Sequence, residues 1–264
     1  MSEELFEKGE KDMYKSYLDF AIELGKEAGQ FIVPHAGKAG QQTVKSAKDF
    51  VTEMDIQVEN LIIRRIKEQY PTHQVFSEEA GNIEGTEDFE WVIDPIDGTV
   101  NYSVGIPLYG VSIALTHKGD PVVAVISLPG LGELFWAAKG EGTFLNGQPI
   151  QVRDASIAEA FISVGDFAKD GNKESNRERL LLLDNIVNDV YRIRIIGTAA
   201  VTLAYIAAGR LDAAIYLNPN WYDVAAGQLL ITEAGGTQSL AGNHTIYATN
   251  KIMDELKNLI LVQQ

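Results

Sequence analysis

Apolar residues recur at helical spacing over residues 14–32, and this periodicity predicts a long N-terminal helix. The same spacing over residues 55–69 predicts a second helix, which ends just before Pro71. The stretch between them, residues 37–49, is polar, and its apolar residues show neither helical nor strand spacing. The first part of the chain is therefore predicted to be mainly helical.

The pattern changes after a short apolar segment at residues 73–76, which is predicted to be a strand. From residue 92 to about residue 152, short β-branched segments alternate with turn sequences such as Pro129-Gly130 and Asn146-Gly147. Such alternation is typical of antiparallel strands joined by tight turns. We therefore predict an antiparallel meander over this region.

After residue 155 the segments alternate between the helical and the strand spacing of apolar residues. Strands are predicted at 161–164, 192–196, 213–216 and 245–248. Helices are predicted at 176–190, 199–208, 223–233 and 251–261. The whole is predicted to be an α/β fold, an α+β sandwich with layered αβαβα architecture. An N-terminal α+β half, residues 1–152, and a C-terminal α/β half, residues 153–264, should pack tightly as one unit.

Composition narrows the function classes. The chain has 264 residues, of which 45% are apolar, a net charge of −15 and no cysteine. The acidic balance argues against binding to nucleic acid or to anionic membranes, and the lack of cysteine excludes disulfides and cysteine nucleophiles. The N-terminal residues do not resemble a signal peptide, and no apolar run is long enough to span a membrane. We expect a soluble cytoplasmic protein.

The segment Trp-Val-Ile-Asp-Pro-Ile-Asp-Gly-Thr, residues 91–99, carries the strongest chemical signal. Pro95 favours extended backbone at Asp94 and Gly98 permits a tight turn, so Asp94 and Asp97 can converge beside the Thr99 hydroxyl. Carboxylates suit a hard cation such as Mg²⁺, and backbone N–H groups at a helix start suit a phosphate. A plain strand-to-helix turn would explain the same residues without any chemistry.

Other segments offer matching groups. Glu78 and Glu79 follow a predicted strand, and Asp55 opens the second helix. Asp223 begins a later helix, where a helix N-cap is the simpler explanation. Residues 197–199 could form one wall of an anion pocket, although close packing explains small residues equally well.

The remaining motifs are less informative. We interpret His35, His73, His117 and His244 as surface or loop residues. The phosphate-binding loop of kinases and NTPases, GxxxxGK followed by Ser or Thr, is absent from the sequence. This absence argues against a kinase or NTPase.

The order of these segments closely resembles the inositol monophosphatase family. It runs DxVTxxD at 49–55, SEEAG at 77–81, WVIDPIDGTxNY at 91–102, GTAA at 197–200 and WYDVAAGxxLITEAGG at 221–236. Members of this family are Mg²⁺-dependent, lithium-sensitive phosphomonoesterases, and many form homodimers. The resemblance therefore implies a hydrolase of small phosphorylated metabolites that is a homodimer and binds roughly two or three Mg²⁺ ions.

The resemblance also implies roles for individual residues. The metal ligands it implies are Glu78, Asp94, the Ile96 carbonyl, Asp97 and Asp223. The catalytic residues it implies are Glu79, which would hold a further water molecule, and the pair Asp55 and Thr99, which would orient the attacking water. The substrate-binding residues it implies are Gly98, Thr99, Gly197, Thr198 and Ala199.

Electrostatics supports this assignment independently. The carboxylates of Glu78, Asp94, Asp97 and Asp223 would repel one another in a low-dielectric site unless cations neutralised them. Metal ions would also activate a water and stabilise the leaving oxygen. No separate nucleophile is evident, so we predict direct in-line attack of water without a phosphoenzyme.

Two departures from the family pattern leave the substrate open. Tyr222 stands between Trp221 and Asp223, where the family usually has Trp directly before the aspartate. Tyr216 occupies the place where inositol-specific members carry an acidic residue. Inositol phosphate, the 2′-phosphate of NADP, fructose 1,6-bisphosphate and nucleotide 3′,5′-bisphosphates all remain candidates. So does a non-catalytic module that binds metal or a phosphometabolite.

Overall fold

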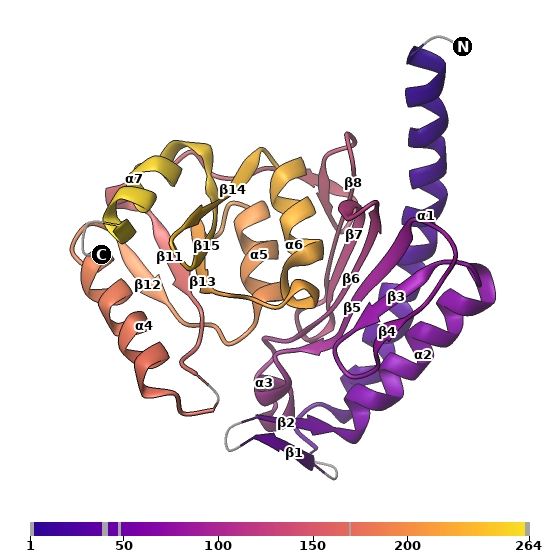
Figure 1. The fold of residues 1–264 in the computed structure, drawn as a ribbon, viewed down its shortest axis with the longest axis horizontal. Coiled ribbons are helices and arrows are strands. Elements are labelled where there is room, and N and C mark those ends of the chain that lie inside the picture. The colour runs from indigo at the N-terminus through magenta and orange to yellow at the C-terminus, as the bar shows by residue number, and fades with distance from the viewer. Residues whose placement is uncertain (1–2, 39–41, 47–48, 169, 262–264) are drawn as a thin grey trace.

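The computed structural model describes residues 3–38, 42–46, 49–168 and 170–261 (Figure 1). Its α-helices are α1 (Glu3–Ile32), α2 (Glu53–Gln69), α3 (Thr99–Val104), α4 (Lys173–Ile186), α5 (Ala199–Ala207), α6 (Trp221–Glu233) and α7 (Asn250–Leu261). Short 3₁₀ helices are η1 (Val33–His35), η2 (Pro129–Leu131) and η3 (Ile157–Glu159). The predicted long N-terminal helix is confirmed and begins eleven residues earlier than expected, at Glu3 rather than Tyr14.

The larger sheet contains eight strands within the described residues, in the order β10-β9-β8-β7-β6-β5-β3-β4. They are β3 (Gln74–Ser77), β4 (Gly81–Ile83), β5 (Phe89–Asp97), β6 (Gly110–His117), β7 (Asp120–Leu128), β8 (Glu133–Ala138), β9 (Thr143–Leu145) and β10 (Gln148–Ile150). Neighbouring strands from β5 to β10 are antiparallel, which confirms the predicted meander. Strand β3 runs parallel to β5, so the sheet is mixed.

The second sheet has the order β12-β11-β13-β15-β14. Its strands are β11 (Phe161–Val164), β12 (Arg192–Arg194), β13 (Ala213–Leu217), β14 (Gly236–Ala241) and β15 (His244–Thr249). Strand β14 was not predicted, because its sequence, Gly-Thr-Gln-Ser-Leu-Ala, opens on Gly236 and shows no regular alternation of apolar and polar residues. A separate antiparallel pair, β1 (Gln42–Ser46) and β2 (Asp49–Thr52), lies between the first two helices, where we predicted no element.

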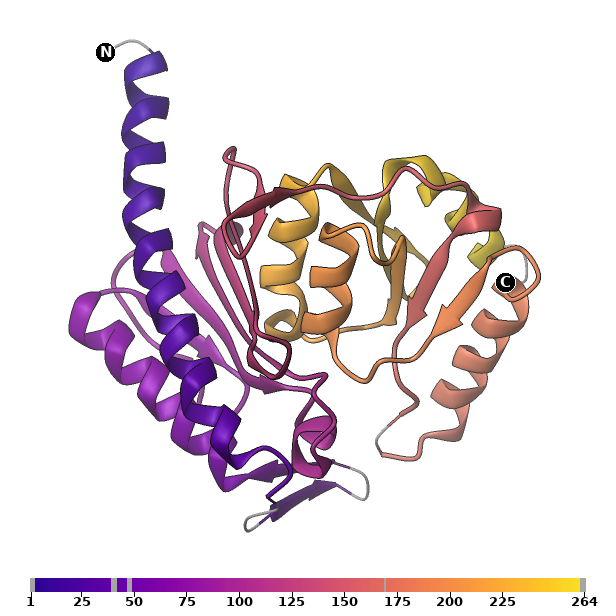
Figure 2. The same ribbon diagram turned by 180° about the vertical axis from the view of Figure 1, so that it is seen from behind.

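The elements stack in five layers, as Figures 1 and 2 show from opposite sides. Helices α1 and α2 cover one face of the larger sheet, and α5 and α6 lie between the two sheets. Helices α4 and α7 cover the outer face of the second sheet. The predicted αβαβα layering of an α/β fold is thus observed, and the central layer of α5 and α6 packs against both sheets.

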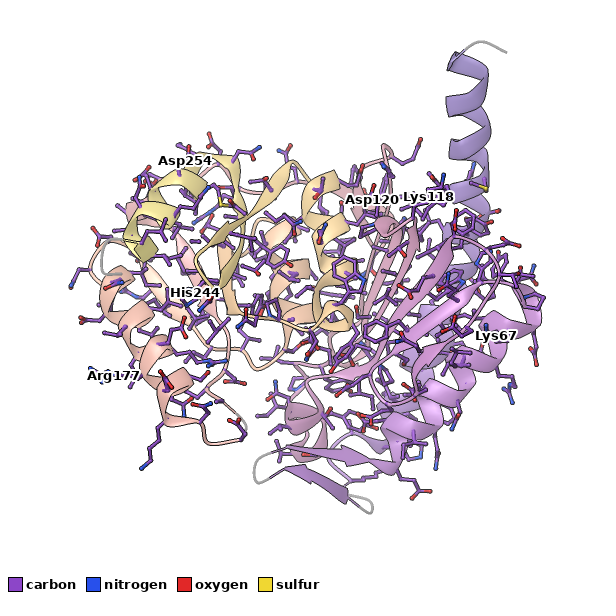
Figure 3. The ribbon with its side chains drawn as sticks, in the orientation of Figure 1. Lys67, Lys118, Asp120, Arg177, His244 and Asp254 are labelled. Atoms are coloured by element: carbon purple, nitrogen blue, oxygen red, sulfur yellow. The ribbon has the colours of Figure 1, made fainter. Side chains whose placement is uncertain are left out.

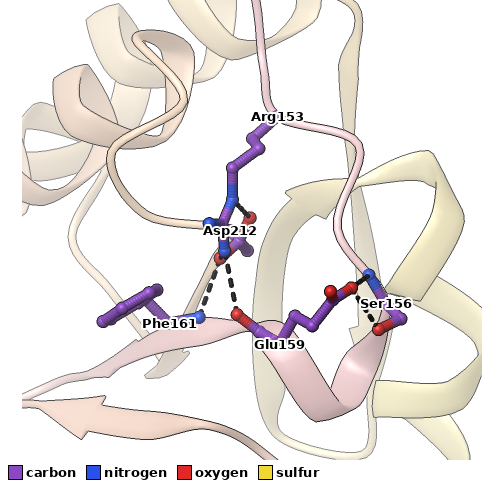
Figure 4. A network of polar contacts seen from close by, with 5 residues as sticks. All are labelled: Arg153, Ser156, Glu159, Phe161 and Asp212. Atoms are coloured by element: carbon purple, nitrogen blue, oxygen red, sulfur yellow. Dashed lines mark hydrogen bonds and ion pairs between the residues drawn. The ribbon is translucent and has the colours of Figure 1, made fainter.

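A buried ion pair fixes the segment that joins the two sheets (Figure 4). The carboxylate of Asp212, fully buried, accepts hydrogen bonds from Arg153 Nε at 2.9 Å and from the Phe161 N–H at 2.7 Å. Arg153 Nη2 also donates to the Glu159 carbonyl at 2.9 Å, and Ser156 and Glu159 form a capping box that starts η3. These contacts set the path of the chain into β11.

The prediction that all four histidines are surface or loop residues is wrong for His244, which is buried in β15, whereas His73 lies in the loop before β3 but is buried there. His73 is 2% exposed, and its Nδ1 accepts a hydrogen bond from the Trp91 indole N–H at 3.1 Å. His244, labelled in Figure 3, is the first residue of β15 and is 5% exposed. Burial lowers the pKa of both His73 and His244, which favours their neutral form, with a single ring N–H.

No helix among the described residues is both long and apolar enough to cross a membrane.

Candidate functional site

Asp94 and Asp97 lie at the end of β5, where the register against β6 is irregular. In a regular strand, residues three apart point to opposite faces of the sheet. The irregularity between Asp94 and Asp97 turns the chain, as a β-bulge does, so both carboxylates reach the same space. Asp94 is 2% exposed and Asp97 is 8% exposed. The sequence prediction that these two side chains converge is consistent with this arrangement.

The pKa values of the Asp94 and Asp97 carboxyl groups are both raised. Burial raises the pKa of Asp94 well above its ordinary value, and the negative charges of Asp97, Glu78 and Asp223 raise it further. Burial and the charge of Asp223 raise the pKa of Asp97 to about 7. The Oδ1 atom of Asp94 is buried and has no hydrogen-bond partner among the described residues. A buried acceptor of this kind is costly unless something positive occupies the site.

Glu78 is presented by the tight turn between β3 and β4. The buried carboxylate of Glu59, on α2, holds this turn: its Oε1 accepts hydrogen bonds from Ser77 Oγ and from the backbone N–H groups of Glu79, at 3.0 Å, and Ala80, at 3.2 Å. Sequence reasoning missed Glu59. Its position two turns into a helix gave no signal, because its partners are 18 to 21 residues away.

Thr99 links the first helix turn of α3 to α2. Its Oγ1 lies 3.2 Å from Asp55 Oδ1 and 3.0 Å from the Ile96 carbonyl oxygen. A hydroxyl has a single proton, so Thr99 donates to one of these acceptors at a time. The predicted pairing of Asp55 with Thr99 is therefore present, and the hydroxyl retains lone pairs for a water molecule.

The start of α5 approaches the end of β5 closely. The Ala200 N–H donates to Asp97 Oδ2, and Asn101 Nδ2 donates to the Ile196 carbonyl at 3.0 Å. Gly98 has a φ of 89°, and a Cβ there would meet the Leu108 carbonyl oxygen at 3.0 Å and Thr198 at 3.2 Å. Only glycine suits such backbone next to such neighbours, so Gly98 permits the loop before α5 to lie against the site.

Asp223 comes from α6, and the alternative explanation of Asp223 as a helix N-cap is wrong. The helix begins at Trp221 with Asn220 as N-cap, which places Asp223 inside the first turn. Asn220 Nδ2 donates to Asp223 Oδ2 at 3.1 Å. Tyr222 lies near Glu78 and Asp223, whose charges add to burial in raising its pKa.

A cavity of about 390 Å³ connects these groups. Its wall includes these residues of the predicted site: Glu78, Asp94, Ile96, Asp97, Gly98, Thr99, Gly197, Thr198, Ala199 and Asp223. Asp55 and Glu79 are not on the wall; Asp55 reaches it through Thr99. Sequence reasoning missed Asp166, Arg179, Asn218 and Asn220, which also line it. Only tertiary packing brings these four to the cavity, since none lies in a recognisable motif.

The donors fit a hard divalent cation. They are carboxylate and carbonyl oxygens, the ligands that Mg²⁺ prefers, and an orphaned buried oxygen of Asp94 is among them. As they stand, no three histidine, aspartate or glutamate side chains of the described residues are drawn together closely enough to hold an ion.

Comparison with known proteins agrees with this geometry. The model of the inositol monophosphatase family matches residues 13–258. The chain belongs to the inositol monophosphatase family. The match covers all the residues that line the cavity, from Glu78 to Asp223.

Relatives within the family carry two kinds of name. The Nus factor SuhB of Escherichia coli K12 is 37% identical over 243 residues, which cover 89% of this chain and 90% of the relative. A fructose-1,6-bisphosphatase/inositol-1-monophosphatase of Thermotoga maritima is 34% identical over 221 residues, covering 83% of this chain and 82% of the relative.

Solved structures of family members have the same fold. The extragenic suppressor protein suhB of Bartonella henselae superposes with a TM-score of 0.89 at 29% identity, covering 94% of this chain and all of that one. The inositol monophosphatase of Thermotoga maritima superposes with a TM-score of 0.85 at 31% identity, covering 93% and 96% of the two chains.

Proposed function

We propose that this family member is a Mg²⁺-dependent phosphatase that hydrolyses small phosphate monoesters, acts as a homodimer and uses water as the nucleophile. The observation that carries the proposal is the buried, unpartnered Oδ1 of Asp94 among the carboxylates of Asp97, Glu78 and Asp223. Such a cluster is costly in a folded protein unless cations occupy it. Glu78, Asp94, Asp97, Asp223 and the Ile96 carbonyl would hold Mg²⁺, which when bound supplies charge stabilisation and an acidified water.

The chain's own groups complete the reaction. Thr99 would accept a hydrogen bond from the attacking water and orient it, while its hydroxyl donates to Asp55, which would take up the proton through Thr99. Glu79 would hold a second water. Backbone N–H groups of Gly98, Thr99, Thr198 and Ala199 would bind the phosphate oxygens, while the Ala200 N–H is already committed to Asp97. Gly197 keeps this loop close to the phosphate position.

The other residues of the cavity wall bear on the class of substrate. Tyr216 lines the cavity where inositol-specific members have an acid, and burial raises the pKa of its hydroxyl, which stays protonated. A tyrosine can hydrogen-bond to a sugar hydroxyl but with less charge than a carboxylate. We therefore propose a broader specificity, for inositol monophosphate-like compounds and the 2′-phosphate of NADP. The relative named fructose-1,6-bisphosphatase/inositol-1-monophosphatase makes sugar bisphosphates a second candidate class.

The decisive experiment measures phosphate release from inositol 1-phosphate, NADP, fructose 1,6-bisphosphate and adenosine 3′,5′-bisphosphate, with Mg²⁺ and with EDTA. Turnover of at least one substrate with Mg²⁺, and none with EDTA, is expected. Asp94→Asn should lower kcat/KM by about 10³-fold or more, because loss of a metal ligand removes several kcal/mol of transition-state stabilisation. It should also abolish thermal stabilisation by Mg²⁺.

Asp254→Asn is the matched control, because Asp254 is an exposed residue of α7 (Figure 3) and does not line the cavity. It should leave both turnover and Mg²⁺ stabilisation unchanged. Folded protein that binds Mg²⁺ but releases phosphate from no substrate would contradict the proposal. It would favour a binding module instead, a role to which the name Nus factor of several relatives would then lend weight.

A further inference from the structure

A side chain of α3 joins the two halves of the molecule beside the cavity. Asn101 lies within α3 and lines the cavity. Its Nδ2 donates to the carbonyl oxygen of Leu108, at 2.8 Å, and to that of Ile196, at 3.0 Å. Leu108 precedes β6 in the first half, whereas Ile196 precedes α5 in the second half (Figure 1). Asn101 therefore ties the segment that leads into α5 to the loop between α3 and β6.

The chemistry of the Asn101 amide suits this bridge. Both partners are carbonyl oxygens, so the group that faces them must be the nitrogen, and an amide nitrogen carries two protons. The backbone of Asn101 is held as well, because its own carbonyl oxygen accepts a hydrogen bond from the Ile106 N–H at 2.9 Å. A hydroxyl has a single proton and cannot make both side-chain bonds. Among the short polar side chains, only an amide can form this bridge.

The bridge acts directly before the N–H groups that we propose bind phosphate. Gly197 follows Ile196 and has a φ of 81°. A Cβ on Gly197 would lie 3.4 Å from Asn101 Nδ2 and 3.3 Å from Asp166 Oδ2, so the chain passes closely between these two side chains. The other end of the segment is fixed by the side chain of Thr198, which is the N-cap of α5. Asn101 and this cap together set the path of the backbone along the cavity wall.

We propose that Asn101 is a positioning residue for the phosphate-binding loop, residues 197–199. This inference rests on the proposed function, in which the N–H groups of Thr198 and Ala199 bind phosphate. Without the bridge, the Ile196 carbonyl would bond to water, and the loop would have to be ordered when the substrate binds. Ordering a loop on binding reduces affinity, whereas a loop that is already in place keeps it. Asn101 thus supplies preorganisation through backbone carbonyls.

Binding of inorganic phosphate, the product of any phosphomonoesterase, tests this. Calorimetry with saturating Mg²⁺ should show that Asn101→Ala weakens phosphate binding by about tenfold, the effect of losing a hydrogen bond of ordinary strength. Mg²⁺ affinity, titrated without phosphate, should not change, because the proposed metal ligands lie on β5, on α6 and in the turn after β3. The two titrations therefore separate a loop effect from a general disturbance of the site.

Kinetics gives a second readout. With a substrate that the wild type hydrolyses, Asn101→Ala should raise KM by a similar factor and leave kcat nearly unchanged. This pattern is expected when a contact of equal strength in the ground state and the transition state is lost. Asn101→Gln keeps the amide on a longer side chain and should recover part of the phosphate affinity. It also provides the comparison with wild type if Asn101→Ala does not fold.

Asn250→Ala is the matched control. Asn250 Nδ2 donates to the Gly235 carbonyl at 3.1 Å, and neither residue lines the cavity. The variant therefore removes the same kind of bond between two elements away from the site. It should change neither phosphate affinity nor KM.

A role in stability alone would have a different signature. The inference is overturned if Asn101→Ala lowers the melting temperature but binds phosphate as the wild type does. It is also overturned if Mg²⁺ binding weakens as much as phosphate binding. The proposed function fails separately, if the wild type hydrolyses no phosphate ester, and phosphate binding then still tests the role of Asn101.

Discussion

Glu59 illustrates how a residue outside the reacting groups can control them. It is 3% exposed, and its carboxylate binds the turn that carries Glu78 and Glu79 rather than the cavity itself. We expect Glu59→Gln to weaken Mg²⁺ binding by about 10- to 100-fold, the usual effect of removing a group that orients a metal ligand. Calorimetric titration of Mg²⁺ measures this directly, without reference to turnover.

The control for Glu59→Gln is Glu68→Gln, an exposed position on the same helix whose side chain is 63% accessible. That variant should bind Mg²⁺ as the wild type does. Equal Mg²⁺ affinity in all three proteins, with a lower melting temperature for Glu59→Gln alone, would mean that Glu59 stabilises the fold without positioning Glu78.

Individual residues differ in how far the sequence could reveal them. Asp94, Asp97 and Thr99 were predictable, because they lie within one short segment whose backbone preferences bring them together. His73 and His244 were misread, since a lone polar residue in a sequence carries no information about burial. Arg179 was invisible for the same reason, as α4 reaches the cavity only through packing.

At the scale of elements, the Asp212 network holds the junction between the sheets. Asp212→Asn should lower the free energy of unfolding by about 3 kcal/mol, the low end for breaking a buried ion pair, because Arg153 is 41% exposed and regains water. Asp154→Asn, which breaks the exposed pair with Lys251, should cost less than about 1 kcal/mol. Urea denaturation compares them, and equal losses for both variants would contradict the buried role of Asp212.

Helices and strands with a clear period were predicted well, and irregular ones were not. The bounds of α2 and α5 matched to within two residues, because the apolar residues of α2 recur at helical spacing and those of α5 form a run that is buried along almost its whole length. Helix α4 ends at Ile186, four residues before the predicted end, and α6 begins two residues early, at Trp221. Strands β1 and β2 were missed because both are short and neither shows a repeated alternation of apolar and polar residues.

At the scale of the molecule, the site depends on both halves. The cavity takes Asp94 and Asp97 from the larger sheet, and Asp223 and Arg179 from residues after 152. Contacts across the junction include Thr143 Oγ1 to the Leu230 carbonyl, at 2.7 Å, and the Glu233 carboxylate to the N–H groups of Gly140 and Gly142. The sequence predicted the order of the elements, but only the packed layers show which of their ends meet.

These contacts lead to a prediction about unfolding. Residue 152 should separate two regions of the topology but not two independently folding units. Both halves are therefore expected to unfold together in a single transition. Tryptophan fluorescence reports mainly on the first half through Trp91 and Trp136, whereas far-ultraviolet circular dichroism reports on all helices, so coincident curves are expected. Saturating Mg²⁺ at about 100 times its Kd should stabilise this one transition by about 2.7 kcal/mol, because the ligands come from both halves. Two separated transitions, with only one of them sensitive to Mg²⁺, would instead show that the halves fold independently and that the carboxylates of one half suffice to bind the ion.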